Sequence, residues 1–202
     1  MTFRRLGVLL VGAALTLAGC GDDSLPRELA GYRREPAPMV GDLTLPDLTE
    51  SGADFALRAD PGELLLVYFG YTNCPDFCPT TLSDLRLATR RMDAEDAGRI
   101  EVAMVTVDPD RDIPILPDYI TSFFEHGHAL ATEDASRLAQ VAGPFGVSYG
   151  VSKTGDGAIE VAHSTALYVV DDVGELLLTW QFGVSIDDLA ADLTHLLQAN
   201  EA

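Results

Sequence analysis

Basic residues are scarce in this sequence, and their scarcity argues against one large class of partners. Lysine and arginine number 13 among 202 residues, against 32 aspartates and glutamates, and the net charge is −19 with histidine neutral. Nucleic-acid binding needs basic side chains that replace the counterions of the phosphates, so no nucleic-acid partner is expected. Adhesion to anionic lipid by charge alone is disfavoured for the same reason. A cation or a basic partner would be attracted, although solubility on a crowded cell envelope explains most of the acidic excess.

The sequence also has no hydrophobic run that can cross a membrane. Its apolar run near the N-terminus, 6–17, holds about 12 residues, whereas a transmembrane helix needs about 20. Arg4 and Arg5 precede this run and Leu-Ala-Gly-Cys20 ends it, a pattern typical of an export signal whose end resembles a bacterial lipobox. We expect 1–19 to be a lipoprotein signal peptide that is cut before Cys20, which then carries lipid. The alternatives are an ordinary secretory signal with Cys20 incidental, and twin-arginine export, which the residues around the arginines fit poorly.

Residues 20–38 are polar, rich in proline and glycine and without a sustained period, as is typical of a flexible tether. The remainder, 39–202, is long enough for one well-buried domain. We therefore expect a lipid-anchored domain on the extracytoplasmic face of a bacterial membrane, on the periplasmic side or at the cell surface. That compartment is oxidising. With Cys20 assigned to lipid, Cys74 and Cys78 are the domain's only thiols, and a zinc site made of cysteine alone is excluded.

Strand and helix patterns alternate along the domain and predict an α/β fold. Segment 64–69 (LLLVYF) is continuously apolar, as expected of a central strand that is buried on both faces. The expected strands are 43–48, 53–57, 64–69, 100–107, 165–170 and 175–182, with hairpins formed by the first two and the last two. The expected helices are 80–93, 114–124, 133–141 with Thr132 as its cap, and a last helix after Ser185. This order is that of a thioredoxin-like fold with an N-terminal hairpin and an insertion before the last hairpin.

The stretch YTNCPDFCPT (71–80) holds the two remaining cysteines where a buried strand passes into a helix. Four residues are close to one helical turn, so both sulfurs can face the same way, at a Cα separation of about 6 Å that a disulfide accepts. A helix N-terminus stabilises a thiolate, so lowered cysteine pKa values are expected. The proline after each cysteine restricts the backbone. Such a pair can form a disulfide or present two thiolates to a metal.

The four histidines are candidates for a third metal ligand. His195 falls off the apolar face of the last helix and is expected to be a solvated polar residue. His126 and His128 (EHGH) lie in an expected loop, where they can grip a metal or form an exposed turn. His163 immediately precedes the strand 165–170. In a thioredoxin-like topology the loop before that strand faces the N-terminus of the first helix, so His163 can meet the cysteine pair.

A set of two thiolates and one imidazole suits copper. Thiolate holds Cu(I), imidazole helps to hold Cu(II), and copper stands highest in the divalent affinity order. A structural zinc site would usually have a fourth protein ligand, and none is evident in the sequence. The alternative is that His163 is a histidine satisfied at the edge of the core.

Three motifs in this order, FGYTNCPDFCPTTL, VTVDPDRDIP and HSTALYVVDDVGEL, closely resemble the Sco/SenC family of membrane-anchored copper chaperones. The resemblance covers 40–197 and implies a thioredoxin-like fold that carries one copper, as Cu(I) or Cu(II). It implies Cys74, Cys78 and His163 as the copper ligands. It also implies a role in assembling the dinuclear copper centre of cytochrome c oxidase, with the copper-bearing subunit of that enzyme or another copper chaperone as partner.

Asp108 and Asp112 match the paired aspartates of the family, which the resemblance links to copper handling or docking. Both also have a purely structural interpretation: Asp112 can cap a helix that begins near Pro114, and Asp108 can close a strand into a turn. The sequence departs from the family pattern around HGHALATEDA and again after Phe182. Neither departure touches the expected ligands, but both leave the partner surface open.

Three alternatives to copper binding remain for these cysteines: two other functions, and a disulfide without a function. A thiol–disulfide oxidoreductase would keep a target's cysteines reduced, with one thiol attacking and the other resolving. A peroxidase of the peroxiredoxin type is suggested by GDLTLPDLTE (41–50) and by Thr72, but it leaves Cys78 and His163 unexplained. A purely structural disulfide would close a loop too short to add much stability.

Overall fold

A seven-stranded mixed sheet forms the centre of the structure, a computed structural model that describes residues 28–200. The sheet has the order β2-β1-β5-β4-β3-β8-β9, and a separate two-stranded sheet pairs β6 with β7. The strands are β1 (Thr44–Asp47), β2 (Ala53–Ala56), β3 (Leu64–Gly70), β4 (Ile100–Thr106), β5 (His128–Leu130), β6 (Tyr149–Lys153), β7 (Ile159–His163), β8 (Leu167–Val170) and β9 (Leu176–Trp180). The helices are η1 (Leu48–Glu50), α1 (Phe77–Thr89), α2 (Ala94–Ala97), α3 (Pro109–Asp112), α4 (Leu116–Thr121), α5 (Ala135–Phe145) and α6 (Ile186–Asn200).

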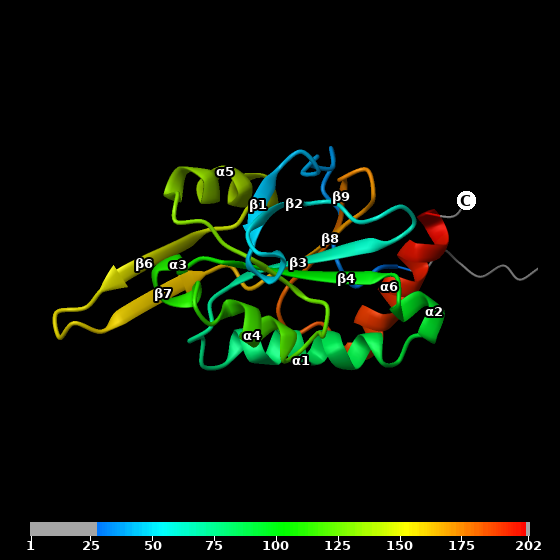
Figure 1. Cartoon of the computed structure of the whole chain (residues 1–202). Coiled ribbons are helices and arrows are strands. Elements are labelled where there is room, and N and C mark those ends of the chain that lie inside the picture. The colour runs from blue at the N-terminus through cyan, green and yellow to red at the C-terminus, as the bar shows by residue number, and fades with distance from the viewer. Residues whose placement is uncertain (1–27, 201–202) are drawn as a thin grey trace, which may run out of the picture.

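Helices cover both faces of the central sheet, which confirms the predicted thioredoxin-like α/β class (Figure 1). All seven residues of β3 are buried. Because successive side chains of a strand point to opposite faces, Leu66 and Tyr68 pack in one core with α1, α4 and α6, whereas Val67 and Phe69 pack in the other with α5. The continuously apolar run in the sequence is therefore the central strand, hydrogen-bonded to β4 on one side and β8 on the other.

Several helix boundaries differ from the predicted ones. The predicted helix 80–93 begins earlier, at Phe77, and this places Cys78 in the first turn of α1. The predicted helix 114–124 is reduced to α4 (Leu116–Thr121). The cap of α5 is Asp134 and not Thr132, because the Asp134 carboxylate accepts from the backbone of Ser136 and Arg137. The Thr132 hydroxyl accepts from the Asp134 backbone instead, one step before the helix.

The insertion between β4 and β8 contains a hairpin that the sequence patterns did not predict. Strands β6 and β7 pair antiparallel through residues that are mostly exposed, and the hairpin extends away from the central sheet (Figure 1). Few of its residues are both apolar and buried, so the alternation of apolar and polar residues that predicts a strand is weak here. The hairpin matters because β7 ends at His163.

The segment just before the predicted domain boundary at residue 39 lies against the domain. Tyr32 pairs with Thr179 of β9 through two backbone hydrogen bonds, and the backbone of Ala30 donates to the buried carboxylate of Asp192 on α6 at 2.9 Å. Residues 30–32 therefore already contact the domain. Cys20 and the predicted signal peptide lie outside the described residues, and no helix within 28–200 is both long and apolar enough to cross a membrane.

Candidate metal centre

The cysteine loop connects the end of β3 to the first turn of α1. Cys74 lies in the loop and is 7% exposed, while Cys78 lies in α1 and is fully buried. Both are free thiols. The backbone N–H of Cys78 points at Cys74 Sγ, 3.4 Å away, so the start of α1 presents an amide to the first sulfur. The early start of the helix thus brings the two sulfurs to the same side, as the four-residue spacing predicted.

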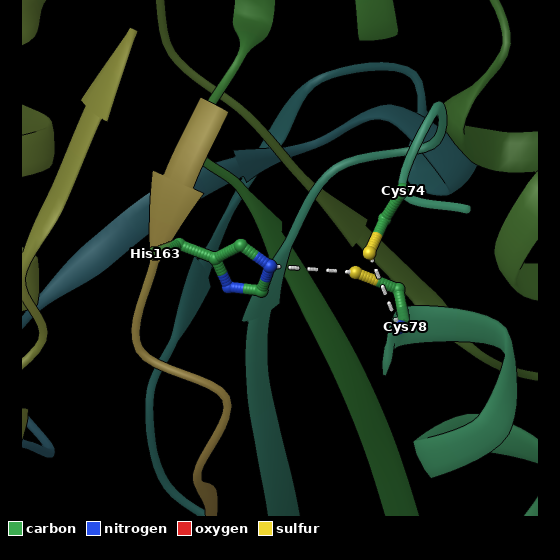
Figure 2. Close-up of side chains that lie close together, drawn as sticks. All are labelled: Cys74, Cys78 and His163. Atoms are coloured by element: carbon green, nitrogen blue, oxygen red, sulfur yellow. Dashed lines mark hydrogen bonds between the residues drawn. The ribbon is translucent and has the colours of Figure 1, made fainter. Parts of the chain in front are cut away.

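His163 approaches this pair from the end of β7. Its Nε2 lies 3.7 Å from Cys78 Sγ, and Figure 2 shows the ring and both sulfurs pointing toward one another. The sequence placed His163 in the loop before the next strand; it is instead the last residue of β7. The strand fixes its backbone, and Tyr71 holds the ring from one side, edge to face, at 5.5 Å between ring centroids.

The imidazole is prepared to accept a metal at Nε2. Its Nδ1 lies 2.8 Å from the Ser164 carbonyl, which can only accept, so Nδ1 carries the hydrogen and Nε2 keeps its lone pair. Burial lowers the pKa of His163 below its usual value, against the opposing effect of the carbonyl contact. The ring is therefore neutral at neutral pH. A carbonyl that fixes the tautomer of a ligating histidine is the usual outer partner in metal sites.

The three candidate ligand atoms form a compact set. The sulfurs of Cys74 and Cys78 and a ring nitrogen of His163 lie within 4.8 Å of one another, close enough for one ion bonded to all three at roughly 2.0–2.3 Å. Two soft thiolates and an imidazole favour copper over hard cations such as magnesium. Among residues 28–200, the other group of this kind is Asp60, Glu63 and Glu101, an oxygen-only set on the part-exposed surface.

Burial dominates the acidity of the second cysteine. It raises the pKa of the Cys78 thiol to about 12, although the Tyr68 hydroxyl and the Tyr71 backbone act in the opposite direction. The expectation that the helix N-terminus would lower this pKa is thus wrong for Cys78, because loss of solvation outweighs the helix dipole. A bound metal reverses this balance, since metal ligation releases the thiol proton.

The carboxylate of Asp112 anchors the cysteine loop through hydrogen bonds. Its buried carboxylate accepts from the Thr72 backbone at 3.0 Å, from the Thr72 hydroxyl at 2.5 Å and from the Thr106 hydroxyl at 2.6 Å. It therefore ties the loop to the end of β4. The proposed cap role is wrong: Asp112 ends α3, and α4 begins after Ile115 without a side-chain cap.

Asp108 lies at the turn from β4 into α3, as its structural interpretation predicted. Its backbone donates to the Thr106 hydroxyl at 3.0 Å, and its buried carboxylate pairs with Arg111. Neither aspartate belongs to the group of candidate ligands found among the described residues. The structure gives Asp112 the closer link to the metal centre, through Thr72.

The other histidines lie elsewhere. His128 opens β5 instead of lying in a loop, contacts the buried Asp47 at 2.7 Å through Nδ1 and packs against the Phe55 ring in a tilted arrangement. His126 is exposed in the preceding turn. His195 is half-buried on α6. None of the three joins a metal-binding group within the described part of the chain, so His163 alone completes the cysteine pair.

Sequence reasoning overlooked Tyr68, which faces the same site from β3. The ring lies edge to face with His163 at 6.3 Å and is fully buried. In the sequence it is one aromatic residue within a continuous apolar run. Its position six residues before Cys74 is the only signal that would have singled it out.

A thioredoxin-like fold with two cysteines where the central strand passes into α1, and a histidine brought from a distant strand, defines a class of small metal-binding proteins. The chain matches the model of the SCO1/SenC family over residues 34–198, and it belongs to that family. It is 28% identical to a protein of Stutzerimonas stutzeri that is named as copper-binding, over 97% of this chain and 96% of the other. Apo Sco1 of Thermus thermophilus is 30% identical, with a TM-score of 0.71 over 84% of this chain and 97% of its own. Copper-bound ScoI of Bradyrhizobium japonicum is 30% identical, with a TM-score of 0.65 over 78% of this chain and 98% of its own.

Proposed function

We propose that this protein is a membrane-anchored, extracytoplasmic copper-binding protein that delivers copper to, or otherwise matures, the dinuclear copper centre of cytochrome c oxidase. The observation that carries the proposal is the convergence of Cys74, Cys78 and the Nε2 side of His163 within one ligand set. Two of its relatives support the metal: one is named as copper-binding and another holds copper in its structure. The target follows from membership of the Sco/SenC family.

The geometry of the three ligands suits a copper ion that must be transferred to an acceptor protein. Three protein ligands leave copper with an open coordination position, and Cys74 is the sulfur with some exposure. A thiolate of the acceptor can therefore bind copper on the Cys74 side before the protein's own ligands leave. Each exchange replaces one copper–ligand bond of this protein, to sulfur or to the imidazole nitrogen, by a bond to the acceptor, so the copper oxidation state need not change.

The anchor is the part of the proposal that rests on sequence alone. Lipid on Cys20 would hold the domain at the membrane surface, and the residues before about 30 would serve as the tether. Labelling with a radioactive fatty acid, in wild type and Cys20→Ser, tests it. Label in the wild type and none in the variant is expected; label in neither would contradict the anchor.

A copper titration tests the function itself. The reduced protein without residues 1–20 is expected to bind one copper per chain, with thiolate-to-Cu(II) charge-transfer bands. His163→Ala should lower the affinity and alter these bands, whereas His195→Ala, which removes a half-buried histidine from α6, should do neither. Equal affinity and equal spectra in wild type and His163→Ala would exclude His163 as a ligand.

Thiol–disulfide exchange is a second candidate, favoured by the free state and proximity of the two cysteines. In that reaction the cysteine pair gives two electrons and two protons to a target disulfide and itself becomes a disulfide. The reaction needs no imidazole ligand. Reduction of an oxidised copper-subunit fragment by copper-free protein, at the same rate in His163→Ala, would favour this function over copper transfer.

A further inference from the structure

The Tyr68 ring and the Cys78 sulfur pack side by side in the core. Both groups pack beside Gly70: a Cβ added to this glycine would lie 2.8 Å from Tyr68 Cε1 and 2.9 Å from Cys78 Sγ. The glycine at the end of β3 is therefore what allows the tyrosine ring and the sulfur to approach each other. The sulfur is fully buried, so water cannot take the place of a protein group beside it.

The hydroxyl of Tyr68 has no hydrogen bond of normal geometry with any residue in the described part of the chain, and it is buried. The Thr81 hydroxyl, three residues after Cys78 on α1, is also buried and without a hydrogen-bond partner among the described residues. A buried hydroxyl without a partner is unfavourable, because it has lost its hydrogen bonds to water. A protonated thiol is a weak acceptor that relieves little of this, whereas a thiolate is a strong one. The site therefore holds a buried donor next to the Cys78 sulfur, and a metal-bound thiolate is the partner that would satisfy it.

We propose that Tyr68 is a positioning residue of the metal centre, whose hydroxyl donates a hydrogen bond to the Cys78 sulfur when that sulfur is a copper ligand. The inference rests on the proposed copper function and adds a regulator to it. Hydrogen bonds to a ligating thiolate draw electron density from the sulfur and thereby stabilise Cu(I) relative to Cu(II). The Thr81 hydroxyl faces the Tyr68 hydroxyl and can in turn donate to its oxygen, which strengthens the donor.

The two sulfurs are then unequal ligands. Cys78 is buried and supported by Tyr68, while Cys74 is partly exposed and lies beside a groove lined by Tyr71, Asn73 and Pro75. The better-supported sulfur holds copper while the exposed one exchanges. The order of ligand release would accordingly be Cys74 first and Cys78 last.

Tyr68→Phe removes the hydroxyl and keeps the ring. We expect the variant to bind one copper, with Cu(I) affinity about 10- to 100-fold weaker, the thiolate-to-Cu(II) bands shifted to longer wavelength and the copper reduction potential lowered. Tyr168→Phe is the matched control, because Tyr168 is also buried in the sheet but packs in the opposite core. Values equal to wild type in Tyr68→Phe would overturn the proposal. Absence of copper binding by the wild type would instead overturn the proposed function.

Thermal unfolding separates this role from ordinary packing. If the hydroxyl serves only the copper-bound state, Tyr68→Phe leaves the Tm of the copper-free reduced protein unchanged or higher, and lowers the Tm of the copper-loaded protein. A structural role would lower both. Replacement of Tyr68 by 3-fluorotyrosine, a stronger donor of nearly the same shape, should shift the charge-transfer bands to shorter wavelength; a shift in the same direction as Tyr68→Phe would also overturn the proposal.

Discussion

His163 Nε2 lies 3.7 Å from Cys78 Sγ although 85 residues separate the two in the chain. The contact depends on two independent pieces of structure: the early start of α1, which buries Cys78, and the β6–β7 hairpin, which ends at His163. The Ser164 carbonyl turns the remaining lone pair of the ring toward the sulfur. Two thiols that are suited to disulfide chemistry thus form, together with His163, a set of three ligands that is suited to copper.

Asp112→Ala should weaken both the fold and the metal centre. Its carboxylate is the acceptor for the backbone and hydroxyl of half-buried Thr72 and for the hydroxyl of buried Thr106. Its loss leaves these three donors without their acceptor, so we expect the free energy of unfolding to fall by about 3 kcal/mol. The cysteine loop should also loosen, with roughly tenfold weaker copper binding. Urea unfolding and copper competition measure the two effects. Asp110→Ala, an exposed change on the same helix, is the control, and an equal response in both variants would refute the bracing role.

Gly70→Ala should damage the site through overpacking. The added methyl would lie 2.8 Å from the Tyr68 ring and 2.9 Å from Cys78 Sγ, closer than carbon or sulfur atoms tolerate. We expect a loss of about 1–3 kcal/mol in the free energy of unfolding and a larger relative loss of copper affinity. Gly150→Ala serves for comparison, because its Cβ would meet nothing within 4 Å. Wild-type copper binding by Gly70→Ala would show that the sulfur is not confined as described.

Asp47 should supply part of the stability that is lost in acid. Burial acts to raise its pKa, but hydrogen bonds from Thr49 and His128 outweigh burial, and the pKa lies below 3.8. A carboxyl with a lowered folded-state pKa stabilises the fold fully above its unfolded pKa, and that contribution disappears as the pH falls through the folded value.

Urea unfolding between pH 2 and pH 6 measures this contribution. In Asp47→Asn the decline of stability below about pH 4 should be shallower than in wild type, with lower stability near pH 6. Asp54→Asn alters an aspartate whose side chain is 62% exposed in its pair with Arg137 and should leave the slope nearly unchanged. The account of Asp47 fails if its variant and wild type decline in parallel.

The residues just before the predicted domain boundary should contribute to stability. Ala30 and Gly31 donate to Asp192, and Tyr32 pairs with Thr179. A variant that starts at residue 39 should therefore be less stable to urea by about 2 kcal/mol than one that starts at residue 28, since it loses three or more hydrogen bonds. Equal midpoints would mean that this segment adds nothing to the fold.

The core of the fold could be predicted because its sequence signals are local. Three local patterns each predict a structure without help from the rest of the chain: the apolar run of β3, the four-residue cysteine spacing and the apolar face of α6. The helix boundaries could not be placed well, because caps depend on geometry: Asp134 and Thr132 are both good caps by type, and only the direction of the chain decides between them.

The candidate site could be predicted only in part, for two physical reasons. Strand order predicted that Cys74, Cys78 and His163 come together, and the structure brings them together; their role as copper ligands stays a prediction. The pKa of Cys78 was expected to fall, but burial, which depends on packing from distant elements, raises it to about 12. The bracing role of Asp112 and the placement of Tyr68 likewise depend on contacts that no local pattern encodes.

X-ray absorption at the copper edge tests the central claim most directly. The reduced protein loaded with one equivalent of Cu(I) should show two sulfur ligands and one imidazole nitrogen, and His163→Ala should lose the nitrogen while keeping both sulfurs. An identical copper environment in wild type and His163→Ala, or a site without two sulfurs, would contradict the three-ligand centre.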